Sequence, residues 1–299
     1  MKTYIGIDLG GTNVRVAKVT ADGQILNEVK SPSYALEGPE KVMTNLISCI
    51  HKIENWKECS GIGVGVPGPV DTLRGEMIMA TNLPGFVRYP IAQTLQTEFG
   101  LPTYVDNDAN VAGLAEALVG AGKGQPVIYY LTHSTGIGGA LVVDGKVVSG
   151  KNGHAGEVGN IIIDRHRQKY NHLNVGAIEN EASGTALIRI GRERLNPDIK
   201  SAGEVFALAK AGNAVALDIV DKMAYDFAAM CSAIAHTVDP YMFVIGGGVT
   251  KSRDLYFDKM VGYFKSMVHT GMQTIEFAIA ELDEPGLIGA AMLPISHGK

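Results

Sequence analysis

Glycine clusters at the ends of apolar segments constrain the fold of this chain more than any other feature. Glycine accounts for 37 of the 299 residues, well above the usual share of about 7%. The clusters lie at residues 10–11, 61–68, 136–139, 153–159 and 246–248, and several of them follow an apolar run. Glycine permits positive φ and lets a ligand approach the backbone closely. Repeated strand-then-glycine turns therefore indicate that the protein handles phosphate groups.

The order of the predicted elements occurs twice along the chain. Residues 4–30 contain three segments that predict a β-meander, and helices then alternate with strands as far as an alanine-rich helix at 108–119. A second series starts with a strand at 127–131 and a hairpin at 138–148, and it ends with a helix at 287–293. The repeat predicts an α/β fold of two lobes with a cleft between them.

The two lobes can be given bounds from this pattern. We place the N-terminal α/β lobe at residues 1–118 and the C-terminal α/β lobe at residues 119–284. The last helix, at 285–299, is expected to pack back on the N-terminal lobe. A chain of this length can bury a sizeable core, and no low-complexity segment or long linker separates the lobes.

Charge and composition exclude several classes of partner. The net charge is −5, with 26 Lys and Arg against 31 Asp and Glu, whereas a domain that clamps nucleic acid usually needs a basic surplus. No apolar run reaches the roughly 18 residues that a membrane span requires, and the N-terminus has no signal-peptide core. The three cysteines, Cys49, Cys59 and Cys231, form no CxxC pair. We therefore expect a cytoplasmic protein with no nucleic-acid or membrane partner.

Three glycine turns have the residue types that bind nucleotides. The turn DLGGTN at 8–13 offers backbone N–H groups and the Thr12 hydroxyl to a phosphate, and Asp8 beside them would suit a hydrated Mg²⁺. The turn STGIGG at 134–139 repeats the pattern, so that the two turns together could grip a polyphosphate. The segment IGGGVT at 245–250 would suit a base or ribose lying against backbone. Ordinary β-turns, and close helix–strand packing at the third segment, are the alternatives.

Two further segments supply polar side chains. The segment VDNDAN at 105–110 lies where a predicted strand meets a predicted helix. One carboxylate there, Asp106 or Asp108, can cap the helix, which leaves the other to take a proton from a sugar hydroxyl, and the spacing leaves open which does which. The segment HAGEVG at 154–159, and Glu179 after it, lie in irregular chain, where an ordinary hydrogen-bonding or solvated role is the alternative.

In order and spacing these motifs resemble the ROK group of bacterial sugar kinases. The resemblance covers essentially the whole chain, and beyond the segments above it includes GIGVGVPGPVD at 61–71, NLPGF at 82–86, ASGTAL at 182–187 and GLIGAA at 286–291. It implies the actin-like ATPase (ribonuclease H-like) fold, the use of ATP with Mg²⁺, and a homodimer. The implied reaction is phosphorylation of a hexose, most commonly a glucose-like sugar at its 6-hydroxyl.

The resemblance also implies roles for single residues. It implies that Asp108 is the general base for the sugar hydroxyl. The residues implied to bind the sugar ring are Asn82, Asn107, His154, Glu157 and Glu179. The expected ATP-binding residues are Asp8, which would hold Mg²⁺ through water, and Gly10, Gly11, Thr12, Thr135, Gly136, Gly138, Gly247 and Gly248.

One departure from the family pattern affects the expected metal. The family usually has a CxCGxxGC zinc site just before the position of Glu179, and here its three cysteine positions hold Tyr170, His172 and Ala177. A tetrahedral zinc site needs four ligands, and only His154 and His172 remain as candidates. No structural zinc is therefore expected.

Without a metal, the polar segment at 164–175 has to be held in another way. An unpinned loop costs more entropy to order, so one interpretation is that the anomeric end of the sugar pocket is more open than in a zinc-bearing glucokinase. Such a pocket would accept β-glucosides. The other interpretation is that packing of the loop replaces zinc and the pocket stays glucose-sized.

Other functions within the same family compete with the hexose kinase. Sugar-responsive repressors carry a helix-turn-helix domain ahead of the first glycine motif, which here begins at residue 8. A catalytically silent sugar sensor would not need Asp108, which is present. The sequence does not identify the acceptor, because glucose, β-glucosides, allose, N-acetylmannosamine and fructose are all family substrates.

Overall fold

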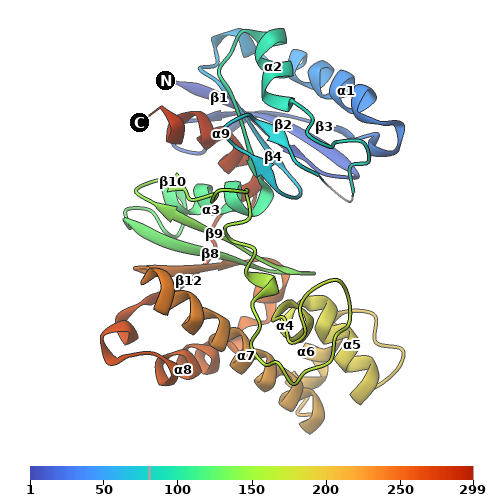
Figure 1. The fold of residues 1–299 in the computed structure, drawn as a ribbon, viewed down its shortest axis with the longest axis vertical. Helices are drawn as coiled ribbons and strands as arrows, with labels where there is room; N and C mark the ends of the chain where they lie inside the picture. Colours follow the sequence, from blue (N-terminus) through green and yellow to red (C-terminus); the bar gives the residue numbers. More distant parts are fainter. Residues whose placement is uncertain (80–81, 299) are drawn as a thin grey trace. The chain divides into compact units, whose positions relative to one another are not determined.

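The computed structural model describes residues 1–79 and 82–298. The chain forms two compact units, both built from strands and helices (Figure 1). Unit 1 comprises Met1–Tyr130, Ala140–Gly156 and Ala280–Lys299, and unit 2 comprises Leu131–Gly139 and Glu157–Ile279. The final residue of the predicted helix at 285–299 lies outside the described residues.

The strands and helices account for most of the predicted elements. The strands are β1 (Thr3–Leu9), β2 (Asn13–Thr20), β3 (Ile25–Pro32), β4 (Ile62–Val66), β5 (Val70–Asp71), β6 (Glu76–Met77), β7 (Thr103–Asn107), β8 (Val127–His133), β9 (Ile137–Val143), β10 (Lys146–Val147), β11 (Met242–Gly246) and β12 (Glu276–Ile279). The α-helices are α1 (Pro39–His51), α2 (Ile91–Phe99), α3 (Asp108–Val119), α4 (Glu179–Ala182), α5 (Gly184–Arg194), α6 (Ala202–Lys210), α7 (Ala214–Val238), α8 (Phe257–Met267) and α9 (Pro285–His297). Short 3₁₀ segments are η1 (Ala35–Glu37), η2 (Trp56–Glu58), η3 (Val158–Asn160), η4 (Gly248–Leu255) and η5 (Thr270–Thr274).

The two large sheets have the same strand order, which confirms the predicted duplication. The first sheet runs β3-β2-β1-β4-β7, and the second runs β10-β9-β8-β11-β12. In the first sheet, β1, β2 and β3 pair antiparallel as the predicted meander, and β4 and β7 extend it in parallel with β1. Each series therefore makes a mixed sheet from a meander followed by two further strands.

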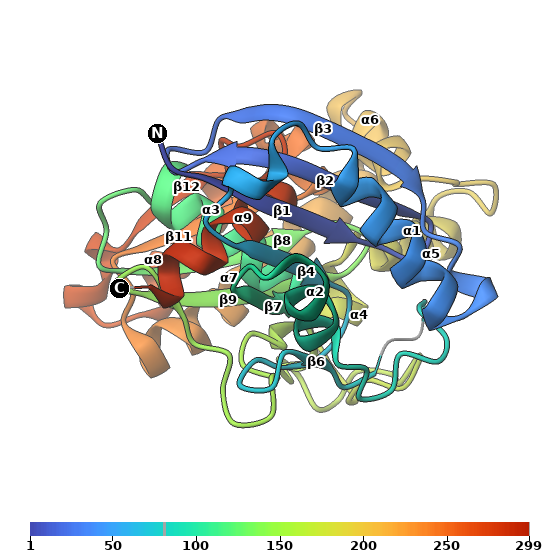
Figure 2. The same ribbon diagram turned by 90° about the horizontal axis from the view of Figure 1, so that it is seen from above.

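In unit 1, helices cover both faces of the first sheet (Figure 1, Figure 2). Apolar residues of α1 at helical spacing, Val42, Leu46 and Ile50, are fully buried beside the strands. On the other side α9 packs on β1, β4 and α3. Glycine allows this close approach, since a Cβ atom on Gly63 would lie 1.8 Å from the carbonyl oxygen of Ala290. The glycines of the 61–68 cluster therefore include one that serves helix packing instead of a phosphate.

In unit 2, the long helix α7 packs against α4, α5, α6 and α8. Its N-terminus is capped by Asn213, whose side chain accepts hydrogen bonds from the backbone N–H groups of Val215 and Ala216. The four-residue helix α4 was not predicted, and Glu179 is its first residue. The expectation that Glu179 lies in irregular chain was therefore wrong.

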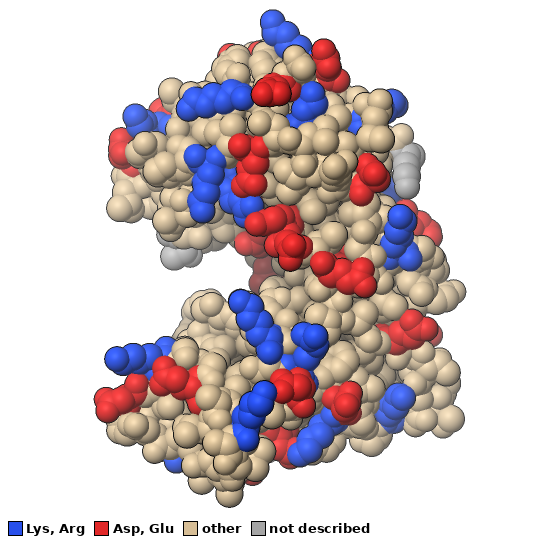
Figure 3. Space-filling model, turned by 180° about the vertical axis from the view of Figure 1, so that it is seen from behind, with Lys and Arg blue, Asp and Glu red and all other residues tan. Residues whose placement is uncertain are grey.

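The surface charge is mixed. Figure 3 shows one face of the molecule, on which Lys and Arg side chains are interspersed with Asp and Glu side chains. Across residues 1–79 and 82–298, no helix combines the length and the apolar character that a membrane span needs.

Candidate functional site

The first glycine turn of unit 1 lies directly against Asn82. The turn closes with a hydrogen bond from Gly10 N to the carbonyl oxygen of Asn13 at 2.9 Å. A Cβ atom on Gly11 would lie 2.6 Å from the carbonyl oxygen of Asn82, so only glycine allows the two segments to touch. Thr12 is exposed at the tip of the turn. Residues expected to bind ATP and a residue expected to bind the sugar are thus neighbours.

Asp8 lies near the end of β1 with a second carboxylate nearby. Burial raises the pKa of Asp8 above its ordinary value, Arg15 opposes this shift, and Glu284 adds to it. Arg15 donates hydrogen bonds to Glu284 and to Glu28. The half-buried Asp8 carboxylate fits Mg²⁺, because Mg²⁺ usually keeps several waters and binds one or two carboxylates together with substrate phosphates.

The two carboxylates at the junction of β7 and α3 differ in their exposure to solvent. Asp106 is buried and accepts hydrogen bonds from Asn107 N at 2.7 Å, Asn110 Nδ2 at 2.7 Å and Ser149 Oγ at 3.1 Å. The pKa of Asp106 lies above its ordinary value because the side chain is buried, and these hydrogen bonds oppose that rise. Asp108 is exposed, and its Oδ1 accepts from Ala109 N at 2.8 Å.

The helix cap at this junction differs from both alternatives. Asn107 is the N-cap of α3, with its Oδ1 accepting from Ala109 N at 2.9 Å and its Nδ2 donating to the Gly68 carbonyl at 3.1 Å. The expectation that Asp106 or Asp108 would be the cap was therefore wrong. The physical reason is that Asn caps a helix as well as Asp does. Asp106 instead fixes the junction from inside, and the exposed Asp108 begins the helix.

The expected sugar ligands His154 and Glu157 are both exposed, but they fall in different units. His154 belongs to unit 1 and Glu157 to unit 2. The His154 segment runs close to β5 at Gly153, which has φ +69° and whose Cβ, if present, would lie 2.2 Å from the carbonyl oxygen of Val70. Glu157 immediately precedes η3.

The second glycine turn, in unit 2, is held by the start of α5 and by Glu179. Gly184 N donates to the carbonyl oxygen of Ser134 at 2.8 Å, and Thr185 N donates to that of Thr135 at 3.2 Å. Glu179 Oε2 accepts from Ile137 N at 2.9 Å. The turn is therefore fixed through its backbone, while Thr135 itself is exposed. A loop held in this way can present N–H and hydroxyl groups to an anion without reorganising.

A cavity of about 350 Å³ in unit 2 opens between this turn and the third glycine segment. Its lining includes Thr135, Gly248, Phe206, Lys200 and Lys251. An apolar ring, cationic side chains and exposed backbone are the features that hold a base, a ribose and phosphates. The cavity thus brings together Thr135 and Gly248, two residues that the sequence analysis expected to bind ATP.

The residue before Ser134, which lines this cavity, is a buried histidine that the sequence analysis did not single out. His133 is fully buried, its Nε2 lies 2.8 Å from the carbonyl oxygen of Ala182, and its ring stacks on Phe227. Because a carbonyl only accepts, Nε2 carries the proton. His133 Nδ1 and the Tyr256 hydroxyl have no hydrogen-bond partner in the part of the chain that the structure describes. Burial lowers the pKa of His133 from 6.5 to about 4.

This histidine predicts acid sensitivity of unit 2. The unfolded chain takes up a proton on His133 near pH 6.5, whereas the folded chain does so only near pH 4, so stability falls as the pH drops through this window. The full loss is roughly 3 kcal/mol at 1.36 kcal/mol per pH unit. Urea unfolding of wild type and His133→Gln between pH 7 and pH 4 measures it. The glutamine variant should show the shallower loss; equal slopes would contradict the assignment.

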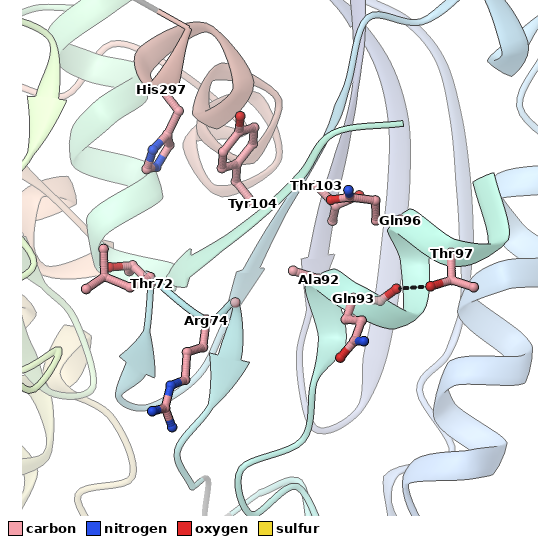
Figure 4. A pocket seen from close by; sticks show the side chains of 11 residues that line it. Thr72, Arg74, Ala92, Gln93, Gln96, Thr97, Thr103, Tyr104 and His297 are labelled. Atoms are coloured by element: carbon pink, nitrogen blue, oxygen red, sulfur yellow. Dashed lines mark hydrogen bonds between the residues drawn. The ribbon is translucent and has the colours of Figure 1, made fainter. Parts of the chain in front are cut away.

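A further cavity, of about 660 Å³, lies in unit 1 and has none of the expected site residues in its lining. It is lined by the β5–β6 turn, α2, the first residues of β7 and the end of α9 (Figure 4). Figure 4 shows the rings of Tyr104 and His297 side by side, and they stack with centroids 4.4 Å apart. Thr103 and Tyr104 begin β7 whereas Asn107 ends it, so the cavity lies at the other end of this strand from Asn107.

The segment that would hold zinc is instead filled by hydrogen bonds and an ion-pair cluster. The Arg189 guanidinium lies 3.6 Å from the centroid of the Tyr170 ring, at one of the former cysteine positions. Arg167 binds three carboxylates in the same region. Among residues 1–79 and 82–298, no group of three or more His, Cys, Asp or Glu side chains is placed to hold a metal ion. The donor set therefore does not fit zinc, and hydrogen bonds and ion pairs hold the loop.

Sequence reasoning missed Arg15, Glu284, His133 and Arg167. Their partners lie far along the chain: Arg15 pairs with Glu284, and Arg167 with a residue of α7. A single arginine in a strand or a loop carries no pattern that identifies such a partner.

Comparison with known proteins places the whole chain in one group. The model of the ROK family matches residues 4–296. A glucokinase from Halalkalibacterium halodurans is 32% identical over 97% of this chain and 94% of its own length. A ROK hexokinase from Thermus thermophilus has a TM-score of 0.89 at 31% identity, covering 99% of this chain and 100% of the other. A ROK family glucokinase from Streptomyces griseus, solved with glucose and AMPPNP, has a TM-score of 0.77 at 27% identity over 97% and 98% of the two chains.

Proposed function

The chain belongs to the ROK family. On this premise we propose that it transfers the γ-phosphate of ATP to the 6-hydroxyl of a hexose, with glucose as the main acceptor. The predicted actin-like ATPase fold and the predicted sugar-kinase activity are both confirmed by the relatives. The observation that carries the choice of glucose is the full-length likeness to a glucokinase solved with glucose and AMPPNP. AMPPNP is an ATP analogue, which supports ATP as the donor.

Unit 1 supplies the proposed acceptor side. Asp108 would accept the proton of the sugar hydroxyl, since it is the exposed carboxylate of the junction. Asn107, fixed by Gly68 and Ala109, would hold the ring, together with Asn82 and His154. Phosphoryl transfer needs mainly positioning and charge stabilisation, and a fixed carboxylate provides the base.

Unit 2 supplies the proposed donor side. The cavity lined by Thr135 and Gly248 would hold the nucleotide, with the Phe206 ring toward the base. Gly136 and Gly138 leave the turn open to phosphate oxygens, as Gly10, Gly11 and Thr12 would in unit 1. Glu157 and Glu179 are the residues of this unit that we propose as sugar ligands.

Magnesium is the metal that this chemistry requires. When bound with ATP it would neutralise charge on the phosphates, and Asp8 would orient its waters, which suits a half-buried single carboxylate. For zinc, the described part of the chain offers no group of three or more His, Cys, Asp or Glu side chains. We also propose that the protein is cytoplasmic and that it forms a homodimer. Light scattering of the purified protein tests the oligomeric state.

The protein should purify without stoichiometric zinc and keep its fold in chelator. Two imidazoles at the former zinc position cannot fill a tetrahedral shell. We expect less than about 0.1 zinc per chain by elemental analysis, and an unchanged melting temperature in EDTA. Activity should vanish in EDTA and return fully with Mg²⁺ alone. One tightly held zinc per chain would overturn the expectation.

A coupled ADP-release assay over a panel of sugars tests the proposed function. The panel contains glucose, N-acetylmannosamine, fructose, allose and a β-glucoside such as cellobiose, each with ATP and Mg²⁺. We expect the highest kcat/KM with glucose. Binding of glucose without ADP release from any sugar would identify a silent sensor instead. A higher kcat/KM with another sugar would keep the kinase and replace glucose as its acceptor.

A further inference from the structure

Arg167 joins three carboxylates from separate segments of unit 2. Its Nη1 and Nη2 atoms donate to the two carboxylate oxygens of Asp226 on α7, each at 3.0 Å. Nη1 also donates to Glu181 on α4 at 2.6 Å, and Nε donates to Asp164 of the same loop at 3.1 Å. The Asp226 and Glu181 side chains are only 3% and 6% exposed. This is a buried cluster and not a surface ion pair.

The two buried carboxylates need this cation. Two like charges taken from water repel each other and lose hydration, so both require an opposite charge at close range. Lys222 is the other cation near Glu181, but its Nζ is 3.9 Å away and its side chain is 47% exposed. The planar fork of arginine can serve both oxygens of one carboxylate and still reach a second. Arg167 is therefore the contact that lets α4 dock against α7.

The residue of α4 that precedes Glu181 is tied to the same loop. The Asn180 and Asn171 side chains exchange two amide hydrogen bonds at 2.9 and 3.0 Å. The carbonyl oxygen of Asn180 accepts from Arg189, whose guanidinium covers the Tyr170 ring. A helix of four residues has no stability of its own, so its orientation is set by such tertiary contacts. In Figure 1, α4 lies beside α7 within unit 2.

Glu179 is the residue that this arrangement orients. It precedes Asn180 and Glu181, and its carboxylate already accepts from Ile137 N in the second glycine turn. We propose that Arg167 is a positioning residue for sugar binding: it fixes α4 through Glu181 and Asp226, and α4 fixes Glu179. The inference rests on the proposed role of Glu179 as a sugar ligand.

Arg167→Lys is the first test, because lysine keeps the charge that compensates the buried carboxylates but loses the fork. We expect the KM for glucose to rise about tenfold or more, since small misplacements of a binding group are costly. The KM for ATP should rise much less, because the nucleotide cavity is lined by other residues and the second glycine turn is still held by Gly184 N and Thr185 N. Arg165→Lys is the matched control, an exposed arginine of the same loop, and should change neither.

A second variant guards against poor folding of the first. Asp226→Asn keeps the side-chain shape, removes one buried charge and leaves Arg167 paired with Glu181. Like Arg167→Lys, it should raise the KM for glucose more than the KM for ATP. If both variants, folded by circular dichroism, leave glucose affinity unchanged, or raise the KM for ATP as much as that for glucose, the proposal is overturned.

Coupling to Glu179 separates positioning from general stability. We expect Glu179→Gln to weaken glucose binding and Arg167→Lys to add little in that background. Additive effects would mean that Arg167 acts elsewhere and would overturn the inference. Glucose affinity by calorimetry makes the cycle independent of turnover. If Glu179→Gln leaves glucose affinity unchanged, the role of Glu179 and this inference both fail, whereas the kinase proposal still depends on the sugar panel.

Discussion

Replacement of Asp108 by asparagine should lower kcat by about 10²–10⁴-fold while leaving glucose affinity within a few-fold of wild type. Asparagine keeps the shape of the side chain, and its Oδ1 can still accept the hydrogen bond that Ala109 N donates at 2.8 Å. The start of α3 is therefore preserved. What is lost is the ability to take the proton of the sugar hydroxyl during transfer. Steady-state ADP release and glucose calorimetry measure the two effects.

Asp106 provides the matched control for this experiment, because it is two residues away and chemically identical. Its buried carboxylate accepts from three donors. In an asparagine, Oδ1 can still accept from Asn107 N and Asn110 Nδ2, while the NH₂ group faces the Ser149 hydroxyl, which can turn to accept. Asp106→Asn should therefore fold as the wild type does and keep kcat within a few-fold of it. If Asp108→Asn kept near wild-type kcat and Asp106→Asn lost it, the assignment of the base would be reversed.

The architecture could be predicted from the sequence because its signals are local and repeated. The meander of β1 to β3 follows from alternating residues and an Asp22-Gly23 turn, and the same order returns in the second sheet. The α3 helix begins and ends at the predicted residues, 108 and 119. Such patterns survive because burial of one face and turn geometry act over a few residues.

The roles of single residues at the junction and in the glycine clusters were harder to predict. A helix start suits each of three neighbouring polar residues, Asp106, Asn107 and Asp108. Their roles are distinguished by how deeply each side chain is buried in the folded protein. Gly63 belongs to a cluster read as phosphate-handling, yet the space it leaves is occupied by the backbone of Ala290. Both outcomes depend on elements that are distant in sequence.

The packing of the loop at 164–177 could not be predicted at all. The loop contains three basic residues close together, Arg165, Arg167 and Lys169. Of these three, Arg167 is the one that pairs with Glu181 on α4 and Asp226 on α7. Neither carboxylate is marked in the sequence, because each is one acidic residue within a helix. The choice is made by tertiary contact, which a local pattern does not encode.

Gly247→Ala should lower the melting temperature by about 4–8 °C, whereas Gly248→Ala should leave it unchanged and weaken ATP binding. Gly247 has φ +94°, and a Cβ there would lie 2.5 Å from the carbonyl oxygen of His133 and 2.7 Å from its carbonyl carbon. These are backbone atoms of β8 and cannot turn aside. Strain and overpacking each cost about 1–3 kcal/mol, so that their sum is at least about 2 kcal/mol.

Gly248 is the matched neighbour, because the nearest heavy atom to its Cβ would be Ser134 Oγ at 3.9 Å. The methyl group fits the empty cavity but occupies space that the nucleotide needs. We expect the KM for ATP to rise about fivefold or more, corresponding to roughly 1 kcal/mol, with the KM for glucose unchanged. Thermal melts and steady-state kinetics of both variants measure these effects. Equal melting temperatures for the two variants would show that Gly247 is not constrained by β8, and an unchanged KM for ATP in Gly248→Ala would place the nucleotide outside this cavity.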